Sequence, residues 1–247
     1  MQDFNSDESP MYYQIPFYDN PKEERYINYK KEHQSYRWEE VITYVNLGLD
    51  YEFYSNVQNI SNPFSLEVLV NKYNRLPGNY TPADLEMIKP CFNTGGLVLR
   101  HDARISFEIM CDAAAEVGIL LKAISTFRSF IYQNQVYLKN FTQELDISEY
   151  QLIRDKVSAR AGHSEHQTGL AVDINDLEQT FEATPEGRWL AANSNRYGYI
   201  LRYPKGKEHI TGYDYEPWHF RYIGLKIADK VYHSGLTYDE YYARYLS

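Results

Sequence analysis

The sequence predicts an α+β protein in which a small antiparallel sheet is flanked by helices. Two observations predict this class. Helical patterns dominate the first half of the 247-residue chain, whereas short apolar runs typical of strands concentrate after residue 118. The apolar fraction of 43% is enough for a sizeable core. Because the helices come first and the strands follow, we expect antiparallel strand pairing.

The first 60 residues predict an N-terminal arm followed by a helical extension. Residues 1–20 are polar and aromatic without a period, and we expect an extended arm there. Residues 22–45 predict helix, because apolar side chains recur at helical spacing: Trp38, Val41, Ile42 and Val45. A loop rich in Asn and Ser follows. Residues 61–247 are expected to form the main domain.

The next part of the chain begins with a helix-start pattern. Thr81-Pro82-Ala83-Asp84 offers a Thr N-cap, Pro at the first helical position and an acid in the first turn. We expect a short helix or 3₁₀ segment there. Residues 100–117 form the clearest helical pattern, with one apolar stripe: Ala103, Phe107, Met110, Ala114 and Val117. Gly118 ends this helix, and residues 119–127 predict a buried strand.

The second half of the chain predicts most of the sheet. Residues 128–157 predict a helix, a break and a second helix. Strands are predicted in residues 169–175, 198–204 and 218–224. Helices are predicted over 185–195, 225–234 and 238–245, and Gly235 ends the second of these.

Composition excludes some classes of partner. The net charge is −9 and the pI about 5.3, so electrostatics does not favour binding to nucleic acid or anionic lipid. Tyrosine is unusually frequent, with 25 residues. We interpret most of them as packing residues, and the alternative is a contact surface for sugars and peptides. Cys91 and Cys111 are too few for a disulfide framework, although a single bridge between them stays open.

Titratable side chains cluster in the stretch GHSEHQTGLAVDI, residues 162–174. Asp173 falls in a predicted strand, where a buried acid is costly unless it is paired or bound to a cation. His166 precedes the turn at Gly169 and can fold back toward Asp173. A His–Asp pair is more often a hydrogen-bonded core couple than a metal site. It becomes a candidate zinc site only with a third ligand.

A second cluster, Glu216-Pro217-Trp218-His219, supplies that third ligand. The set His166, Asp173 and His219 leaves the fourth zinc position open for water, as catalytic zinc requires. Zinc lowers the pKa of such a water toward about 7. Glu216 lies close to His219 in sequence and can act as the general base. His163 is left as either a neighbour of the site or an ordinary loop residue.

These blocks resemble the signatures of the VanY-type D-alanyl-D-alanine carboxypeptidases. The family pattern is Ser-x-His, Gly-x-Ala-x-Asp and Glu-x-x-His, and the chain has Ser164-Glu165-His166, Gly169-Leu170-Ala171-Val172-Asp173 and Glu216-Pro217-Trp218-His219. The resemblance covers about residues 65–235. It implies the zinc peptidase fold that this group shares with L,D-carboxypeptidases, D-Ala-D-Ala dipeptidases and the hedgehog domain. It also implies Zn²⁺ held by His166, Asp173 and His219, with Glu216 as catalytic base.

A third block, ISTFRSFIYQNQVY, is similar to the family's Ser-x-Tyr-Arg-Ser-x-x-x-Gln. Phe127 replaces the commoner Tyr. Arg128 closes a buried strand, where a substrate carboxylate or a developing oxyanion would be its natural partner. The alternative is a salt bridge to a neighbouring acid. Gln135, seven residues on, and Ser164 are expected to help bind the terminal carboxylate, and Trp218 to form a pocket wall.

The resemblance implies a zinc-dependent carboxypeptidase that removes the C-terminal D-alanine from peptidoglycan stem peptides, in residues 61–247. Two alternatives stay open: an L,D-carboxypeptidase acting on tetrapeptide stems, and a non-catalytic zinc-containing wall-binding module. Ala161 stands where relatives often have Pro, which removes no reacting group. We expect a monomer that acts outside the cytoplasm. The absence of an 18-residue apolar run is consistent with a signal or membrane anchor upstream that this chain lacks.

Overall fold

The structure is a computed structural model that describes residues 12–142 and 146–247. Its α-helices are α1 Glu23–Glu32, α2 Trp38–Leu47, α3 His101–Ala115, α4 Phe130–Tyr137, α5 Ile147–Val157, α6 Pro185–Asn193, α7 Glu208–Thr211, α8 Leu225–Ser234 and α9 Tyr238–Tyr245. Its strands are β1 Gln58–Asn59, β2 Asn74–Arg75, β3 Leu85–Met87, β4 Val98–Arg100, β5 Ala123–Ser125, β6 Ala171–Ile174, β7 Tyr199–Leu201 and β8 His219–Tyr222. The predicted α+β class is confirmed.

The central sheet contains four strands in the order β5-β6-β8-β7, and each neighbouring pair is antiparallel. One face of the sheet is apolar because side chains alternate along each strand. Val172 on β6 and Phe220 on β8 point from this face into the main core. Helix α3 packs on the same face of the sheet, and Phe107 and Met110 of its apolar stripe belong to the same core. The other face of β6 and β8 is polar.

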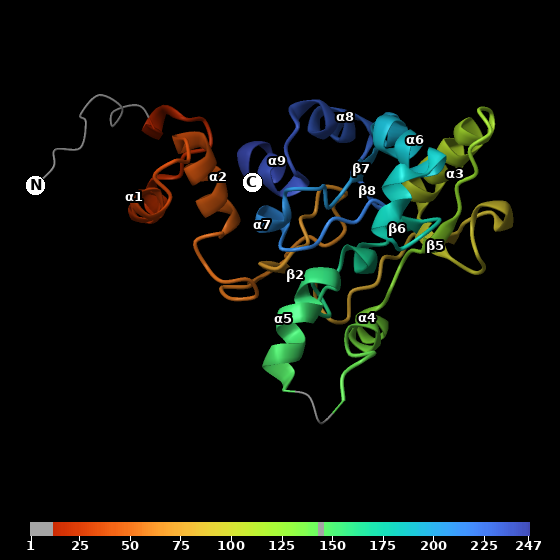
Figure 1. Cartoon of the computed structure of the whole chain (residues 1–247), viewed down its shortest axis with the longest axis horizontal. Helices are drawn as coiled ribbons and strands as arrows, with labels where there is room; N and C mark the ends of the chain where they lie inside the picture. Colours follow the sequence, from red (N-terminus) through yellow and green to blue (C-terminus); the bar gives the residue numbers. More distant parts are fainter. Residues whose placement is uncertain (1–11, 143–145) are drawn as a thin grey trace, which may run out of the picture.

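The N-terminal part forms two helices where residues 22–45 predicted one helical region. The chain breaks between α1 and α2, and both helices share a small core of Tyr26, Val41, Ile42 and Val45. Helix α2 packs against α9, so the hairpin of α1 and α2 lies beside the C-terminus at one end of the long axis (Figure 1).

Only part of the predicted extended arm, residues 1–20, can be compared with the structure, because residues 1–11 lie outside the described residues. From Tyr12 onward the arm is not extended. The chain forms a 3₁₀ turn at Tyr12–Gln14. It then packs Ile15 and Phe17 against the α1–α2 core. The apolar side chains between the polar ones explain this, since they bury surface that an extended arm would leave in water.

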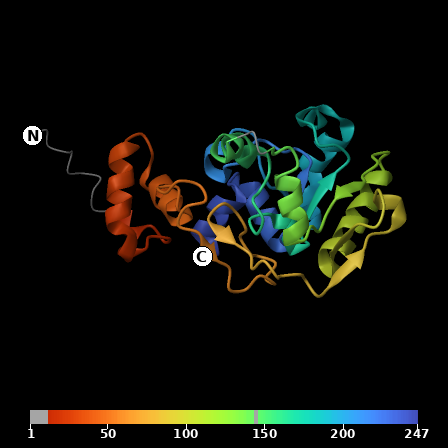
Figure 2. The same ribbon diagram turned by 90° about the horizontal axis from the view of Figure 1, so that it is seen from below.

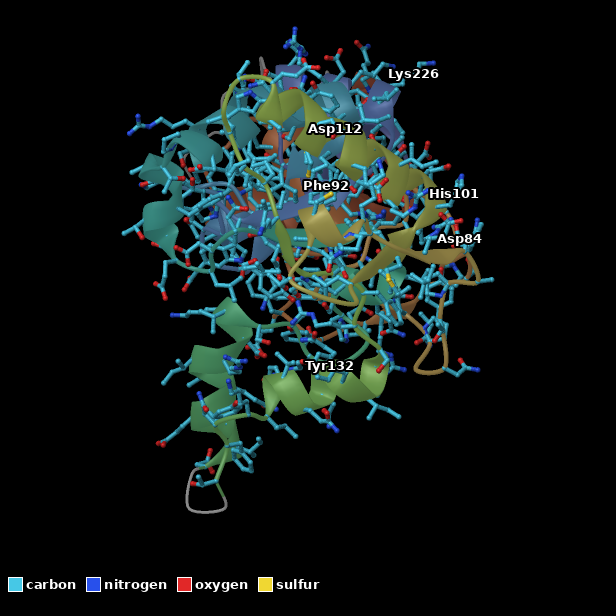
Figure 3. The ribbon with its side chains drawn as sticks, turned by 90° about the vertical axis from the view of Figure 1, so that its right-hand side faces the viewer. Asp84, Phe92, His101, Asp112, Tyr132 and Lys226 are labelled. Atoms are coloured by element: carbon cyan, nitrogen blue, oxygen red, sulfur yellow. The ribbon has the colours of Figure 1, made fainter. Side chains whose placement is uncertain are left out.

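The predicted helix start at Thr81-Pro82-Ala83-Asp84 is wrong. The segment leads into strand β3, which pairs antiparallel with β4. Asp84 accepts hydrogen bonds from Arg100 Nε at 3.0 and 3.1 Å, and the Asp84 carbonyl accepts from His101 N. Asp84 and His101 lie close together at this edge of the molecule (Figure 3). Pairing with a distant strand therefore overrides the local capping signal.

Helices α4 and α5 project together from the body of the molecule, and Tyr132 on α4 marks this projection in Figure 3. Seen from below, the two helices lie beside the central sheet (Figure 2). The helix–break–helix prediction for residues 128–157 is confirmed, with residues 143–145 of the connection outside the described part. In the described residues, no helix combines the length and apolar character needed to span a membrane. Cys91 and Cys111 are both free.

Candidate active site

The polar face of the two inner strands carries the centre of the site. Asp173 on β6 and His219 on β8 are Cα partners in the antiparallel register, so their side chains emerge side by side. Asp173 Oδ1 lies 3.1 Å from His219 Nδ1. Both residues are about 5% exposed or less. The strand alternation that buries Val172 and Phe220 in the core therefore directs this acid and this imidazole to the opposite face.

His166 reaches the same point from a 3₁₀ turn, Glu165–Thr168. The Ser164 side chain caps the turn by accepting from His166 N at 3.3 Å, and Gly169 ends it in the left-handed conformation with φ 68°. His166 Nδ1 faces the Thr126 carbonyl at 2.6 Å. Since a carbonyl only accepts, Nδ1 carries the proton and Nε2 keeps its lone pair.

The geometry of these three residues fits a metal ion. One ligand atom from each of His166, Asp173 and His219 lies within 4.8 Å of the others. His166 Nε2 points at Asp173 Oδ2 at 3.2 Å. His166 Nε2 and Asp173 Oδ1 are buried yet form no hydrogen bond among the described residues, a costly arrangement without a further partner. Two imidazole nitrogens and one carboxylate are a donor set that suits zinc.

Protonation of the three residues is set by burial and by their mutual charges. Burial, aided by the positive charge of Arg128, lowers the pKa of His166 to about 4. Burial opposes ionisation of Asp173, but both histidines hold the pKa of this carboxyl well below its usual range. Burial also opposes the charge on His219, and the surrounding carboxylates prevail and raise its pKa to about 9. Metal binding at His219 therefore has to release a proton.

A buried carboxylate that sequence reasoning did not single out stands behind His219. Glu165 is 1% exposed, and its Oε1 accepts from Arg202 Nε and Arg221 Nη1, both at 2.8 Å. Its Oε2 has no hydrogen-bond partner among the described residues and lies 3.7 Å from His219 Nε2. Arg202 continues the network to Asp239 at 2.5 Å. Glu165 is thus placed to accept the Nε2 proton and leave Nδ1 free to bind a metal.

Glu216 lies just before strand β8, three residues before His219. Its Oε2 is 3.5 Å from His219 Nδ1, the ring atom that also faces Asp173. Burial, together with the negative charge of Asp173, raises the pKa of Glu216 to about 7, although the charges of His219 and Arg128 oppose this. A carboxylate with a pKa near neutrality, beside the candidate metal ligands, is chemically suited to accept and return a proton.

Arg128 lies in the loop between β5 and α4 and is anchored by its backbone N, which donates to the His166 carbonyl at 3.1 Å. Its side chain forms no ion pair within the described part of the chain, and Nε is buried without a hydrogen bond. Burial lowers the pKa of the guanidinium, while Asp173 and Glu216 oppose that shift. The predicted alternative, a salt bridge to a neighbouring acid, is therefore not found in residues 12–142 and 146–247.

A pocket of about 340 Å³ contains these groups. It lies between the projecting α4–α5 pair and the polar face of the sheet. Residues predicted for the site that line it are Arg128, Ser164, His166, Asp173, Glu216, Trp218 and His219. Tyrosines contribute further walls: Tyr203, Tyr213 and Tyr215.

Gln135 is the predicted site residue that the structure does not bring to the pocket. It is exposed on α4. Gln133 lines the pocket instead, donating from Nε2 to the Ala159 carbonyl at 2.7 Å, while its buried Oε1 has no partner among the described residues. The helical turn explains the difference, because positions two residues apart face about 200° away from each other. The block Ser129-x-x-x-Gln133 carries the correct spacing.

Comparison with known families identifies the family of this chain. The family described as VanY: D-alanyl-D-alanine carboxypeptidase matches residues 96–225, more than half of the chain. Among curated proteins, the putative carboxypeptidase YodJ of Bacillus subtilis is 38% identical over 198 residues, covering 76% of this chain and 71% of that protein. The D-alanyl-D-alanine carboxypeptidase of Enterococcus faecalis is 37% identical over 181 residues, covering 70% of this chain and 64% of that protein.

Solved structures show the same fold. The LdcB LD-carboxypeptidase is 38% identical with a TM-score of 0.69, covering 77% of this chain and 91% of that one. A mutant of the vancomycin resistance D,D-pentapeptidase VanY, solved in complex with Zn(II), is 34% identical with a TM-score of 0.61, covering 72% and 98%. These similarities confirm the predicted zinc peptidase fold.

Proposed function

This chain belongs to the VanY family of D-alanyl-D-alanine carboxypeptidases, and on that premise we propose that it is a zinc-dependent peptidoglycan carboxypeptidase that releases the C-terminal D-alanine of stem peptides. The observation that carries the proposal is Arg128, whose guanidinium faces a polar pocket without an ion-pair partner among the described residues. A free C-terminal carboxylate is the ligand that pairs best with such a group, through a bidentate fork.

Zinc binding is assigned to His166, Asp173 and His219. The unpartnered His166 Nε2 and Asp173 Oδ1, the 3.1 Å approach of His219 Nδ1 to Asp173, and the Zn(II) complex of the VanY relative support this assignment. Zinc in such a site supplies Lewis-acid chemistry, because it polarises a carbonyl and makes water a nucleophile near neutral pH. Arg202 and Arg221 hold Glu165, whose Oε2 lies beside His219 Nε2, so that the other ring nitrogen, Nδ1, is left for the metal.

Glu216 is assigned as the general base. Its carboxylate accepts a proton from the attacking water and then delivers that proton to the amine of the leaving D-alanine. The proximity of Glu216 Oε2 to His219 Nδ1, 3.5 Å, supports a proton transfer beside the candidate metal ligands. One carboxylate therefore serves both proton transfers of the hydrolysis.

Arg128 is assigned to bind the terminal carboxylate and thereby fix which bond is cut. The unpartnered Oε1 of Gln133 and the Ser164 hydroxyl are available in the same pocket, which Trp218 also lines. A bound carboxylate would satisfy the charge of Arg128, whereas a cross-linked peptide without a free terminus would leave it unpaired. This favours a carboxypeptidase over an endopeptidase.

An L,D-carboxypeptidase that acts on tetrapeptide stems is the second candidate, because the LdcB structure is similar to this chain over 77% of its length. Both reactions release D-alanine with the same catalytic groups. They differ in the configuration of the residue before the scissile bond, which the pocket walls select. A non-catalytic wall-binding role is less compatible with Glu216 at its present position.

The deciding experiment is a digest of two synthetic peptides by the zinc-loaded protein. One is a pentapeptide stem that ends in D-Ala-D-Ala, and the other is a tetrapeptide stem that ends in L-Lys-D-Ala. Mass spectrometry detects released D-alanine, and a chelator control tests the metal requirement. We expect release from the pentapeptide. Release from the tetrapeptide alone would select the L,D reaction, and release from neither would overturn the enzymatic proposal.

We further propose that the chain acts outside the cytoplasm as a monomer, with residues 61–247 as the catalytic domain. The peptidoglycan recognition named for the LdcB relative supports the location. Size-exclusion chromatography with light scattering checks the monomer.

A further inference from the structure

The loop of residues 49–57, here called the Tyr54 loop, sends one side chain toward the active site. Its neighbours are exposed, with Phe53 40% and Tyr51 38% accessible, whereas Tyr54 is partly buried. Tyr54 also has φ 64°, in the left-handed region that bulky residues rarely occupy. Such a backbone conformation persists only where the surrounding contacts impose it. The contacts of the Tyr54 side chain therefore hold this backbone conformation in place.

The Tyr54 hydroxyl joins two segments of the pocket wall. It accepts a hydrogen bond from Arg160 N at 3.4 Å and lies 3.2 Å from the hydroxyl of Tyr213. Burial raises the pKa of Tyr54 to about 12, so the hydroxyl keeps its proton at neutral pH and has a donor for Tyr213. The guanidinium of Arg160 lies over the Tyr54 ring, 4.1 Å from its centroid, and holds the ring from one side.

The first segment leads to the pocket through a single peptide unit. The amide between Ala159 and Arg160 donates its N–H to Tyr54 and accepts from Gln133 Nε2 at 2.7 Å through its carbonyl. Because a trans peptide is planar, its N–H and C=O point in opposite directions. The rigid Ala159–Arg160 peptide is thus bound by Tyr54 on its outer side and by Gln133 on the side that faces the pocket.

The second segment leads to the candidate metal ligands through a series of aromatic rings in tilted contact. Tyr213 packs on Tyr203 with centroids 4.8 Å apart, and Tyr203 packs on His219 with centroids 4.9 Å apart. Both tyrosines line the pocket. The ammonium of Lys72 lies 4.1 Å from the Tyr213 ring and 4.7 Å from the Tyr54 ring, which ties the two rings together from behind.

We propose that Tyr54 is a positioning residue for the carboxypeptidase site: the N-terminal segment fixes the pocket wall through the Ala159–Arg160 peptide and Tyr213. This inference rests on the proposed function for its kinetic consequence. The N-terminal segment that carries Tyr54 lies outside the stretch matched by the family, residues 96–225. The pocket wall of this chain is therefore supported by a residue that lies outside the matched stretch.

The test compares Tyr54→Phe with Tyr51→Phe in the full-length, zinc-loaded protein. Tyr54→Phe removes only the hydroxyl that joins the two segments. Tyr51→Phe removes a hydroxyl on the same loop that forms no hydrogen bond with the described residues, so it is the matched control. Tyr54→Gly, which also removes the ring and relieves the backbone conformation, is the stronger variant.

We expect Tyr54→Phe to raise KM for the stem peptide about threefold to tenfold with kcat reduced less, and with unchanged zinc content. Amide hydrogen exchange should speed up in residues 158–163 and 211–215. Tyr51→Phe should match the wild type in both measurements. Tyr54→Gly should lower kcat/KM further.

Two results would overturn the inference. One is wild-type KM and wild-type hydrogen exchange in Tyr54→Phe when the wild-type protein is active. The other is a lower melting temperature in Tyr54→Gly with kcat/KM unchanged, which would mean a purely structural role. If the zinc-loaded wild type releases no D-alanine, the proposed function fails, and hydrogen exchange in the two segments alone decides the positioning role of Tyr54.

Discussion

Asp173 and His219 face each other as Cα partners across the β6–β8 pair, so two of the three candidate metal ligands are placed by strand register. A slip of one residue in that register would move one of them to the apolar face of the sheet. His166 alone comes from a turn, and that turn is fixed by Ser164 and Gly169. The site is therefore built mainly on rigid backbone rather than on side-chain adjustment.

Replacing Asp173 should separate metal binding from folding. Asp173→Asn keeps the shape of the side chain but offers a neutral amide where zinc needs a carboxylate. We expect loss of bound zinc, measured by atomic absorption after desalting, and loss of turnover. Asp214→Asn is the control, because Asp214 lines the same pocket without belonging to the ligand group. Full zinc content in Asp173→Asn would contradict the ligand assignment.

Replacing Glu216 should reduce turnover without affecting zinc binding. Glu216→Gln removes the proton acceptor and leaves His166, Asp173 and His219 in place. We expect zinc content close to that of the wild type and a loss in kcat of roughly 10²- to 10⁴-fold, the usual contribution of general acid–base catalysis. Single-turnover assays with excess enzyme measure this loss. A zinc-loaded variant that retains turnover would rule out Glu216 as the base.

Replacing Arg128 should weaken recognition of a free C-terminus. A charge-assisted hydrogen bond contributes about 1.5–3 kcal/mol, so Arg128→Met should lower kcat/KM roughly 10- to 150-fold. A substrate with a C-terminal amide should be poor for the wild type and change little in the variant. Arg154→Met is the control, since Arg154 lines the pocket but already donates to the Val136 and Tyr137 carbonyls. Equal losses for both substrates would contradict carboxylate binding by Arg128.

Replacing Glu165 should weaken zinc binding through His219. Removal of an outer carboxylate partner of a ligating histidine typically costs about 10- to 100-fold in metal affinity, and we expect this range for Glu165→Gln in chelator competition. Asp239→Asn is the control, because it breaks the buried ion pair with Arg202 at the far end of the same network. Both variants should lower the free energy of unfolding by several kcal/mol, of the order of 3–5 for a broken buried pair. A normal zinc affinity in Glu165→Gln would show that His219 needs no such partner.

High pH should unfold the protein through its buried tyrosines. Burial raises the pKa of Tyr26, Tyr29 and Tyr44 to about 12, whereas an unfolded tyrosine ionises near 10. The unfolded state therefore loses protons first, so this stabilisation is complete below about pH 10 and disappears as the pH rises through 12. We expect tyrosinate absorbance to rise together with loss of circular dichroism. Ionisation of all 25 tyrosines without unfolding would contradict this.

Much of the fold could be predicted from local patterns, because helices such as α3, α8 and α9 follow apolar stripes and caps that are visible in the sequence. The start predicted at Thr81 failed because β3 gains more from pairing with β4 than from a local cap. The break between α1 and α2 was missed because the helical spacing was read from Trp38, Val41, Ile42 and Val45, which all lie in α2.

The site was partly predictable for a similar reason. The motif residues lie in short blocks, and the structure brings His166, Asp173, His219, Glu216 and Arg128 into one pocket. Gln135 was predicted in place of Gln133, although the Ser-x-x-x-Gln spacing, counted from Ser129, would have identified it. Tyr54 and the Glu165–Arg202–Asp239 network gave no sequence signal, because their contacts join segments that lie far apart in the chain.

The order β5-β6-β8-β7 places both ligand-bearing strands inside the sheet, with β5 and β7 at its edges. Edge strands fray before inner ones, and the inner pair opens only when the whole domain does. Heat should therefore abolish activity at the same temperature at which the protein melts, without an earlier stage of folded but inactive protein. The thermal half-life of the enzyme would then be set by the unfolding rate of the sheet.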